Sequence, residues 1–151
     1  MKKPATLCFC LKGDEILLPM KKKGFGEGKP NGYGGKVEDG ETPTGAMARE
    51  LGEESGLIAD EASFEPACVV DYSFDGVPKF ECHVFLLRAW SGDPVETEEM
   101  SPRWYALDAI PYDEMWLADA RMLPELLAGK RGRLAVNYGD DGKKILSYEW
   151  R

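Results

Sequence analysis

Short apolar runs separated by turn residues dominate the chain and predict a framework made mainly of β-strands. The runs over 4–11 and 15–20 flank Lys12-Gly13-Asp14, an arrangement that predicts a first hairpin. Longer runs over 64–75 and 79–90 are rich in β-branched and aromatic residues, and an Asp-Gly-Val-Pro segment separates them. This second pair predicts a long hairpin.

The remaining non-helical segments supply further strands and a loop. Residues 31–35 form a short glycine-rich strand, where missing side chains let a ligand or metal approach the backbone. Residues 91–102 are acidic and predict a loop, whereas 103–107 predict a strand. The chain ends in a predicted hairpin of 132–139 and 143–150, turned by Asp-Asp-Gly.

Two segments carry helix signals. Thr42 is suited to cap a helix, Pro43 to open it and Gly56 to end it, so about three turns are expected there. A second helix is expected over 119–129, with a proline disturbing its early part. Strands before and after each helix predict an α/β (α+β) fold in one domain, residues 1–151, with helices on both faces of a mixed central sheet.

The first helix carries a cluster of acids. Glu50, Glu53 and Glu54 stand at i, i+3 and i+4, so their carboxylates are expected to project from one face. The adjacent apolar stripe, which can dock the helix on a core, consists of Met47, Ala48 and Leu51. A run of charges is ordinarily a solvated surface, but three neighbouring carboxylates repel one another and are hard oxygen ligands suited to Mg²⁺ or Mn²⁺.

The spacing of the flanking residues favours the metal site. The pattern consists of Gly35, Glu41, Arg49-Glu50-Leu51, Glu53-Glu54 and Gly56-Leu57. It resembles the signature of the Nudix hydrolases, with every specified position filled. The resemblance implies an α/β/α sandwich with a mixed central sheet, and metal-dependent hydrolysis.

The resemblance also implies a metal site and a catalytic set. Mg²⁺, or Mn²⁺, would be held by Gly34, through its carbonyl, and by Glu50, Glu53, Glu54 and Glu99. Glu53 and Glu54 would serve mainly as ligands, and either Glu50 or Glu99 would be the general base. Arg49 would orient the glutamates.

Stretches beyond the signature resemble Nudix enzymes that act on oxidised purine nucleoside triphosphates such as 8-oxo-dGTP. They are residues 20–37, 95–104 and 110–116. By this resemblance Asn31 would hydrogen-bond the base and Trp116 would stack on it, because an amide can donate and accept and an aromatic face suits any base. The other expected nucleotide contacts are Thr6, Lys21, Phe25, Tyr72, Phe74, Phe80, Met100 and Asp119. For Phe74 and Phe80, a purely structural role in the core is an equally good interpretation.

One position departs from that resemblance. Those enzymes have two consecutive acids where this chain has Ala118-Asp119, so Ala118 is expected to face the base without a carboxylate. A single carboxylate matches fewer combinations of donors and acceptors. A narrower or altered range of purines is therefore predicted.

Composition limits the partners and the location. A net charge of −8 argues against binding long nucleic acid, whereas a small anionic substrate remains compatible because a bound cation dominates the local field. The chain shows neither a signal peptide nor an apolar run of about 18 residues, so we expect a cytoplasmic monomer without membrane contact. The four cysteines lack the spacing of a metal site and are expected to be reduced, mostly buried thiols.

Together these features predict hydrolysis of oxidised purine nucleoside triphosphates to the monophosphate and pyrophosphate, which would sanitise the nucleotide pool. Two alternatives remain open. A Nudix pyrophosphohydrolase for another nucleoside diphosphate derivative would need a different pocket outside the signature. A non-catalytic nucleotide sensor would keep the fold, but such modules commonly have a damaged signature, and this one is intact.

Overall fold

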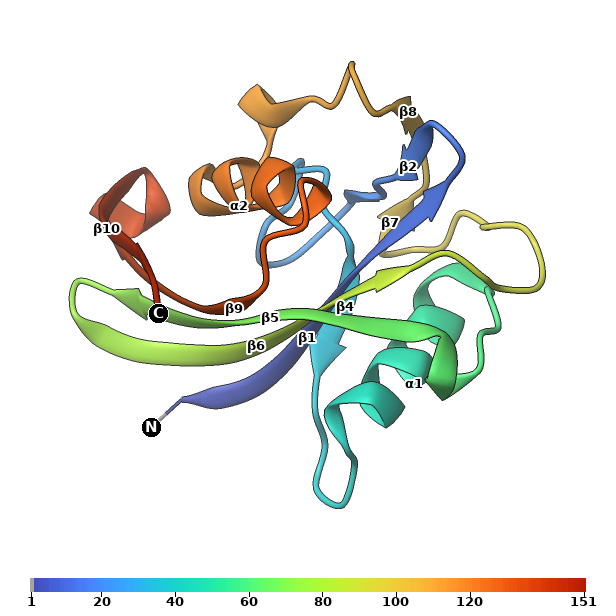
Figure 1. Cartoon of the computed structure of the whole chain (residues 1–151), viewed down its shortest axis with the longest axis horizontal. Coiled ribbons are helices and arrows are strands. Elements are labelled where there is room, and N and C mark those ends of the chain that lie inside the picture. The colour runs from blue at the N-terminus through green and yellow to red at the C-terminus, as the bar shows by residue number, and fades with distance from the viewer. Residues whose placement is uncertain (1) are drawn as a thin grey trace.

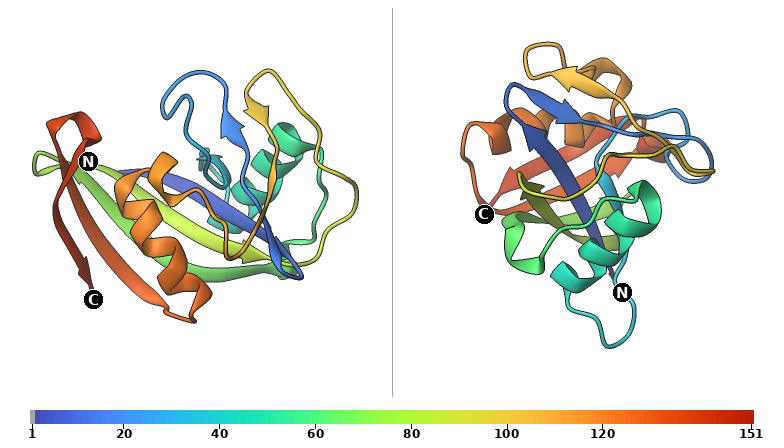
Figure 2. Two further views of the ribbon diagram at one scale, coloured as in Figure 1. Left: turned by 90° about the horizontal axis from the view of Figure 1, so that it is seen from above. Right: turned by 90° about the vertical axis from the view of Figure 1, so that its right-hand side faces the viewer.

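A long, twisted, mixed sheet forms the centre of the molecule (Figures 1 and 2). The structure is a computed structural model that describes residues 2–151. Its strand order is β10-β9-β5-β6-β1-β2-β8, and β4 pairs with β1 beside this path. The bounds are β1 Lys3–Lys12, β2 Glu15–Leu17, β4 Tyr33–Lys36, β5 Phe64–Phe74, β6 Val77–Leu87, β8 Trp104–Ala106, β9 Gly132–Gly139 and β10 Lys144–Trp150. The pairs β1–β6 and β5–β9 are parallel and the others antiparallel, which confirms the mixed sheet.

Two helices cover opposite faces of this sheet, α1 (Pro43–Ser55) and α2 (Leu117–Leu127) (Figure 1). The central strand β1 is apolar on both sides, so successive residues contribute to different cores. Phe9 packs in the cluster under α2, and Cys8 and Cys10 pack in the cluster under α1. The predicted layering is therefore confirmed.

The caps predicted for α1 are present. The Thr42 hydroxyl accepts a hydrogen bond from the Gly45 N–H at 3.0 Å, and Pro43 is the first helical residue. Gly56 has φ +79° and donates its N–H to the Gly52 carbonyl at 2.9 Å, so it ends the helix. Met47 and Leu51 are fully buried, which confirms the docking stripe.

The long hairpin has a tighter turn than expected. Only Asp75 and Gly76 separate β5 from β6, with φ +50° and +79°, while Val77 and Pro78 belong to β6. Two positive φ angles match the right-handed twist of the strands, which is why a two-residue Asp-Gly turn suffices here.

The expected strand over 15–20 is wrong, because it is interrupted. β2 ends at Leu17, and Pro19 lacks the N–H that a continuing ladder would need. After Pro19 a new strand, β3 (Met20–Lys21), pairs with β7 (Met100–Ser101), which lies inside the segment expected to be only a loop.

The second helix begins two residues earlier than predicted and also ends two residues earlier. Trp116 precedes its first residue without a side-chain cap of its own, so a local start signal is missing. Instead, the hydroxyl of Tyr138 on β9 accepts the Ala118 N–H at 2.9 Å. The start of this helix is therefore satisfied by a distant strand.

All four cysteines are free and buried, as expected. Neither helix within residues 2–151 is long and apolar enough to cross a membrane.

Candidate active site

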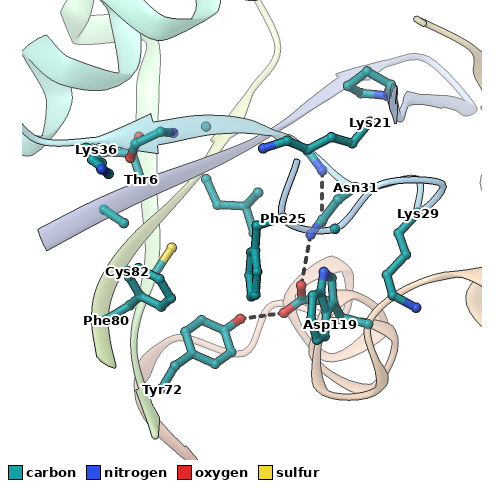
Figure 3. Close-up of a pocket in the computed structure, with 18 of the residues that line it drawn as sticks. Thr6, Lys21, Phe25, Lys29, Asn31, Lys36, Tyr72, Phe80, Cys82 and Asp119 are labelled. Atoms are coloured by element: carbon teal, nitrogen blue, oxygen red, sulfur yellow. Dashed lines mark hydrogen bonds between the residues drawn. The ribbon is translucent and has the colours of Figure 1, made fainter. Parts of the chain in front are cut away.

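A cavity of about 340 Å³ opens between the sheet, the segment before β4 and the start of α2 (Figure 3). It is lined by all ten residues expected to contact the nucleotide, namely Thr6, Lys21, Phe25, Asn31, Tyr72, Phe74, Phe80, Met100, Trp116 and Asp119. They come from most of the chain length, so the fold alone brings them together.

The cavity wall also contains residues that the sequence analysis missed. Cys82 follows Phe80 at the two-residue period of β6, a signal that could have been used. Lys29 lies over the Trp116 ring with its amino group 5.3 Å from the ring centroid, and Lys36 joins the wall from the end of β4. Tyr138 comes from the last hairpin, where no local pattern marks it.

Aromatic rings form the apolar part of the cavity. Phe25 stacks on Trp116 with centroids 5.0 Å apart and planes inclined by 27°, although 63% of Phe25 remains exposed. Phe74 and Phe80 lie 6.5 and 6.3 Å from Phe25, and both line the cavity. Phe74 also stacks on Tyr138 at 5.4 Å, so it is part of both the wall and the core.

A buried carboxylate forms the polar end of the cavity. Asp119 accepts hydrogen bonds from the Tyr72 hydroxyl and, at 2.9 Å, from the Asn31 side-chain amide. Burial raises the pKa of Asp119, and these two hydrogen bonds oppose that rise because they stabilise the charged form.

Ala118 does not lie where the sequence analysis expected it. It is only 1% exposed, packs in the core under α2 and is not part of the cavity wall. The expectation that it faces the base is therefore wrong. At the first turn of α2 its neighbour Asp119 points into the cavity, and the Ala118 side chain points into the core.

The three acids of α1 have different surroundings. Glu54 is 6% exposed and accepts the Gly34 N–H at 3.0 Å, whereas the side chain of Glu53 is 60% exposed. Burial, reinforced by repulsion from Glu50 and Glu99, raises the pKa of Glu54 to about 8 against the opposing Gly34 hydrogen bond. The three carboxylates therefore differ in exposure, because the helix turns Glu54 toward β4 and leaves Glu53 toward solvent.

Glu50 lies against strand β4 at Gly35. A Cβ atom added at Gly35 would be 2.3 Å from the carboxyl carbon of Glu50, so a larger residue would displace this carboxylate from its position. Burial raises the pKa of Glu50, and the neighbouring carboxylates Glu53 and Glu99 add to the effect, while Arg49 opposes it.

Glu99 is held near the other acids by backbone contacts. Its carbonyl accepts the Lys22 N–H at 2.8 Å, next to the β3–β7 pairing. The Lys22 amino group also bonds the Glu96 carboxylate at 2.7 Å and the Thr97 carbonyl at 2.9 Å. Three contacts of one lysine thus tie this loop to the cavity side of the molecule.

The donor set suits a hard divalent cation. Glu99 lies close enough to repel both Glu50 and Glu54, whose pKa values it raises, and Glu53 adds a further carboxylate on the same helix. Among residues 2–151, no three His, Cys, Asp or Glu side chains converge closely enough in the present positions to hold an ion. Carboxylate oxygens are nevertheless the ligands that Mg²⁺ and Mn²⁺ prefer, so the residues fit the metal in kind.

Arg49 organises the acidic cluster. Its Nε and Nη2 atoms bond the Glu41 carboxylate at 2.8 and 2.9 Å, and Nη1 bonds Glu50 at 2.9 Å and Glu53 at 3.2 Å. Nη2 also reaches the Lys36 carbonyl at 3.1 Å. The hydrogen bonds from Arg49 lower the pKa of Glu41 to about 2, so this pair stays charged.

Replacing Arg49 by lysine should lower kcat by about tenfold or more, because an ammonium cannot make this forked set of contacts and Glu50 would lose its orientation. KM should change less. Steady-state kinetics measure the effect, and Arg88→Lys is the matched control, since Arg88 makes a single exposed pair with Glu65. Equal losses in both variants would show that Arg49 has no positioning role.

Comparisons with known proteins agree with this geometry. Residues 1–126 match the NUDIX domain. The oxidized purine nucleoside triphosphate hydrolase of Mus musculus is 40% identical over 147 residues, which cover 97% of this chain and 92% of that protein. The protein of the same name from Danio rerio is 41% identical over 127 residues, covering 83% and 80%. A mutator MutT protein from Bacillus halodurans has the same fold, with a TM-score of 0.82 at 22% identity over 97% of this chain and 96% of that one. The chain therefore belongs to the NUDIX family.

Proposed function

We propose that this protein hydrolyses oxidised purine nucleoside triphosphates such as 8-oxo-dGTP to the monophosphate and pyrophosphate, and so sanitises the nucleotide pool. The observation that carries the proposal is one cavity that has an aromatic wall, a polar end at Asn31 and Asp119, and the glycines of β4 at its border. The names of the mouse and zebrafish relatives support the same reaction.

Strand β4 connects the two parts of the site. Gly34 and Gly35 both line the cavity. Gly34 also donates its N–H to Glu54, and Gly35 lies against the carboxylate of Glu50. A nucleotide with its base near Asp119 can therefore extend its phosphates along β4 toward the acidic helix. Lys21 lines the cavity on this route and offers a cation to the phosphates.

We propose the metal site from the NUDIX resemblance, and the carboxylates of α1 beside β4 support it. Mg²⁺ or Mn²⁺ would be held by the Gly34 carbonyl and by Glu50, Glu53, Glu54 and Glu99. When bound, such a cation neutralises phosphate charge and lowers the pKa of an attacking water. Either Glu50 or Glu99 would take the proton from that water, and Arg49 would keep Glu50 in place.

We also propose that residues 1–151 act as one domain. The NUDIX match ends at residue 126, but the strands after it, β9 and β10, extend the same sheet, and Tyr138 of β9 reaches the cavity. The cytoplasmic location and the monomeric state stay predictions from the sequence.

Pyrophosphate release from a panel of nucleotides tests the proposed function. We expect 8-oxo-dGTP to be hydrolysed in Mg²⁺ or Mn²⁺, and activity to disappear in excess EDTA and return on adding metal, because the anionic helix face and the substrate need a cation between them. Formation of nucleoside monophosphate is followed as well, because cleavage of a sugar nucleotide or a dinucleotide yields two monophosphates and no pyrophosphate. Preferential cleavage of either would favour a Nudix pyrophosphohydrolase for another nucleoside diphosphate derivative. Tight binding of triphosphates without product would favour a nucleotide sensor.

A further inference from the structure

The hydroxyl of Tyr72 lies at the polar end of the cavity, directly against Asp119 (Figure 3). Asp119 is 5% exposed, and each of its oxygens already has one donor. Tyr72 donates to Oδ1, and the side-chain amide of Asn31 donates to Oδ2 at 2.9 Å. Each oxygen keeps a second lone pair that can accept from a ligand.

The direction of the Asn31 contact is set by its own backbone neighbour. The Gly32 N–H donates to Asn31 Oδ1 at 2.9 Å, so the amide nitrogen must be the atom that faces Asp119. An amide nitrogen can only donate, and therefore Oδ2 of Asp119 must accept and cannot carry a proton toward Asn31. Tyr72 donates to Oδ1, so both oxygens of this carboxyl group act as acceptors toward the protein.

The carboxylate of Asp119 is not paired with a cation in the described part of the chain. Within residues 2–151, Asp119 forms no ion pair with lysine, arginine or histidine. The titratable groups that face it are Cys68 and Tyr72 from β5, Cys82 from β6 and Tyr138 from β9. Burial raises the pKa of all four, so they are neutral near pH 7. Hydrogen bonds from Tyr72 and Asn31 are thus the main support for a charged Asp119.

We propose that Tyr72 is a positioning residue that keeps Asp119 a hydrogen-bond acceptor, so that the cavity selects purines whose edge presents adjacent N–H donors. This inference rests on the proposed function. A guanine-type edge offers N1–H and the N2 amino group to the carboxylate. An adenine-type edge places the N1 acceptor there, and two acceptors facing each other in a buried site are unfavourable.

The Tyr72→Phe variant tests this role. It removes the hydroxyl and keeps the ring, which stacks on Tyr138 with centroids 6.2 Å apart. Calorimetric binding of 8-oxo-dGMP and 8-oxo-dAMP, which differ only at the edge in question, measures base preference without requiring hydrolysis. We expect the wild type to bind 8-oxo-dGMP more tightly than 8-oxo-dAMP. In the variant the ratio of the two dissociation constants should shrink by about tenfold.

The dependence on pH separates positioning from a general structural defect. Without the Tyr72 donor the pKa of Asp119 should rise. As the pH is lowered, binding of 8-oxo-dGMP should therefore begin to weaken at a higher pH in the variant than in the wild type. Tyr148→Phe is the matched control, because the Tyr148 hydroxyl also donates to a carboxylate, that of Glu125, outside the cavity. This control should keep the wild-type preference and pH profile.

Each outcome bears on one of the two proposals. Unchanged base preference and an unchanged pH profile in Tyr72→Phe would overturn the role of Tyr72, whether or not the enzyme hydrolyses 8-oxo-dGTP. Failure of the wild type to bind 8-oxo-dGMP more tightly than 8-oxo-dAMP would overturn it as well. Selective binding that depends on Tyr72, without pyrophosphate release from 8-oxo-dGTP, would instead remove the proposed function and leave the inference standing.

Discussion

Glu54→Gln is expected to lower kcat for 8-oxo-dGTP by about 100-fold or more without unfolding the protein. The substitution removes the charge of a proposed metal ligand but keeps its shape, and the amide oxygen can still accept the Gly34 N–H. Steady-state kinetics at saturating Mg²⁺ measure the effect. Glu98→Gln is the control, since Glu98 is almost fully exposed and pairs only loosely with Lys23 at 3.7 Å. Near-normal turnover in Glu54→Gln would mean that this carboxylate does not bind the metal.

The same variant should change how stability depends on pH. Glu54 has its pKa raised from 4.5 to about 8 in the folded protein. Its contribution to stability is therefore complete below pH 4.5 and is lost as the pH rises through about 8, because the folded state then holds a buried charge. In EDTA, Glu54→Gln should unfold at a higher temperature than the wild type at pH 8 to 9, and the difference should vanish near pH 4. A constant difference across this range would contradict the burial of a titrating Glu54.

Gly34→Ala is expected to reduce the free energy of unfolding by about 3 kcal/mol or more. A Cβ atom at this position would lie 2.0 Å from the Thr6 carbonyl oxygen and 2.9 Å from its carbon. Both are backbone atoms of β1, with which β4 pairs, so no side-chain rotation can relieve the collision. Urea unfolding at equilibrium measures the loss.

Gly52→Ala is the matched control for that experiment. Gly52 lies inside α1, and the nearest atom to an added Cβ is the Leu57 carbonyl oxygen at 3.8 Å, an ordinary contact. Alanine should stabilise the helix there by roughly 0.5–1 kcal/mol. Similar stabilities for Gly34→Ala and the wild type would show that β4 is not packed as closely on β1 as the structure describes.

Local sequence determined the elements whose signals lie within a few residues. The start and end of α1 depend on Thr42, Pro43 and Gly56, each of which acts on backbone groups of the same helix turn. The β5–β6 hairpin likewise depends on its own Asp-Gly turn. Such features are readable because the interacting atoms are close along the chain.

Part of the cavity wall was also predictable, but through resemblance and not through local physics. Ten residues assigned to the nucleotide line one cavity, although Thr6 and Asp119 are far apart in the chain and no periodicity connects them. Their surroundings could not be predicted in the same way. Neighbouring Glu53 and Glu54 look alike in the sequence, yet only Glu54 is buried against Gly34.

Tertiary structure alone decided the features that depend on contacts between distant segments. At the start of α2 the Tyr138 hydroxyl of β9 accepts the Ala118 N–H, while the Ala118 side chain packs in the core and Asp119 lines the cavity. The hydrogen bonds that oppose the rise in the pKa of Asp119 come from Tyr72 in β5 and from Asn31 in the segment before β4. Hydrogen bonding and burial of this kind are set by what the fold brings within about 3 Å, and one residue's identity does not reveal which partners it will meet.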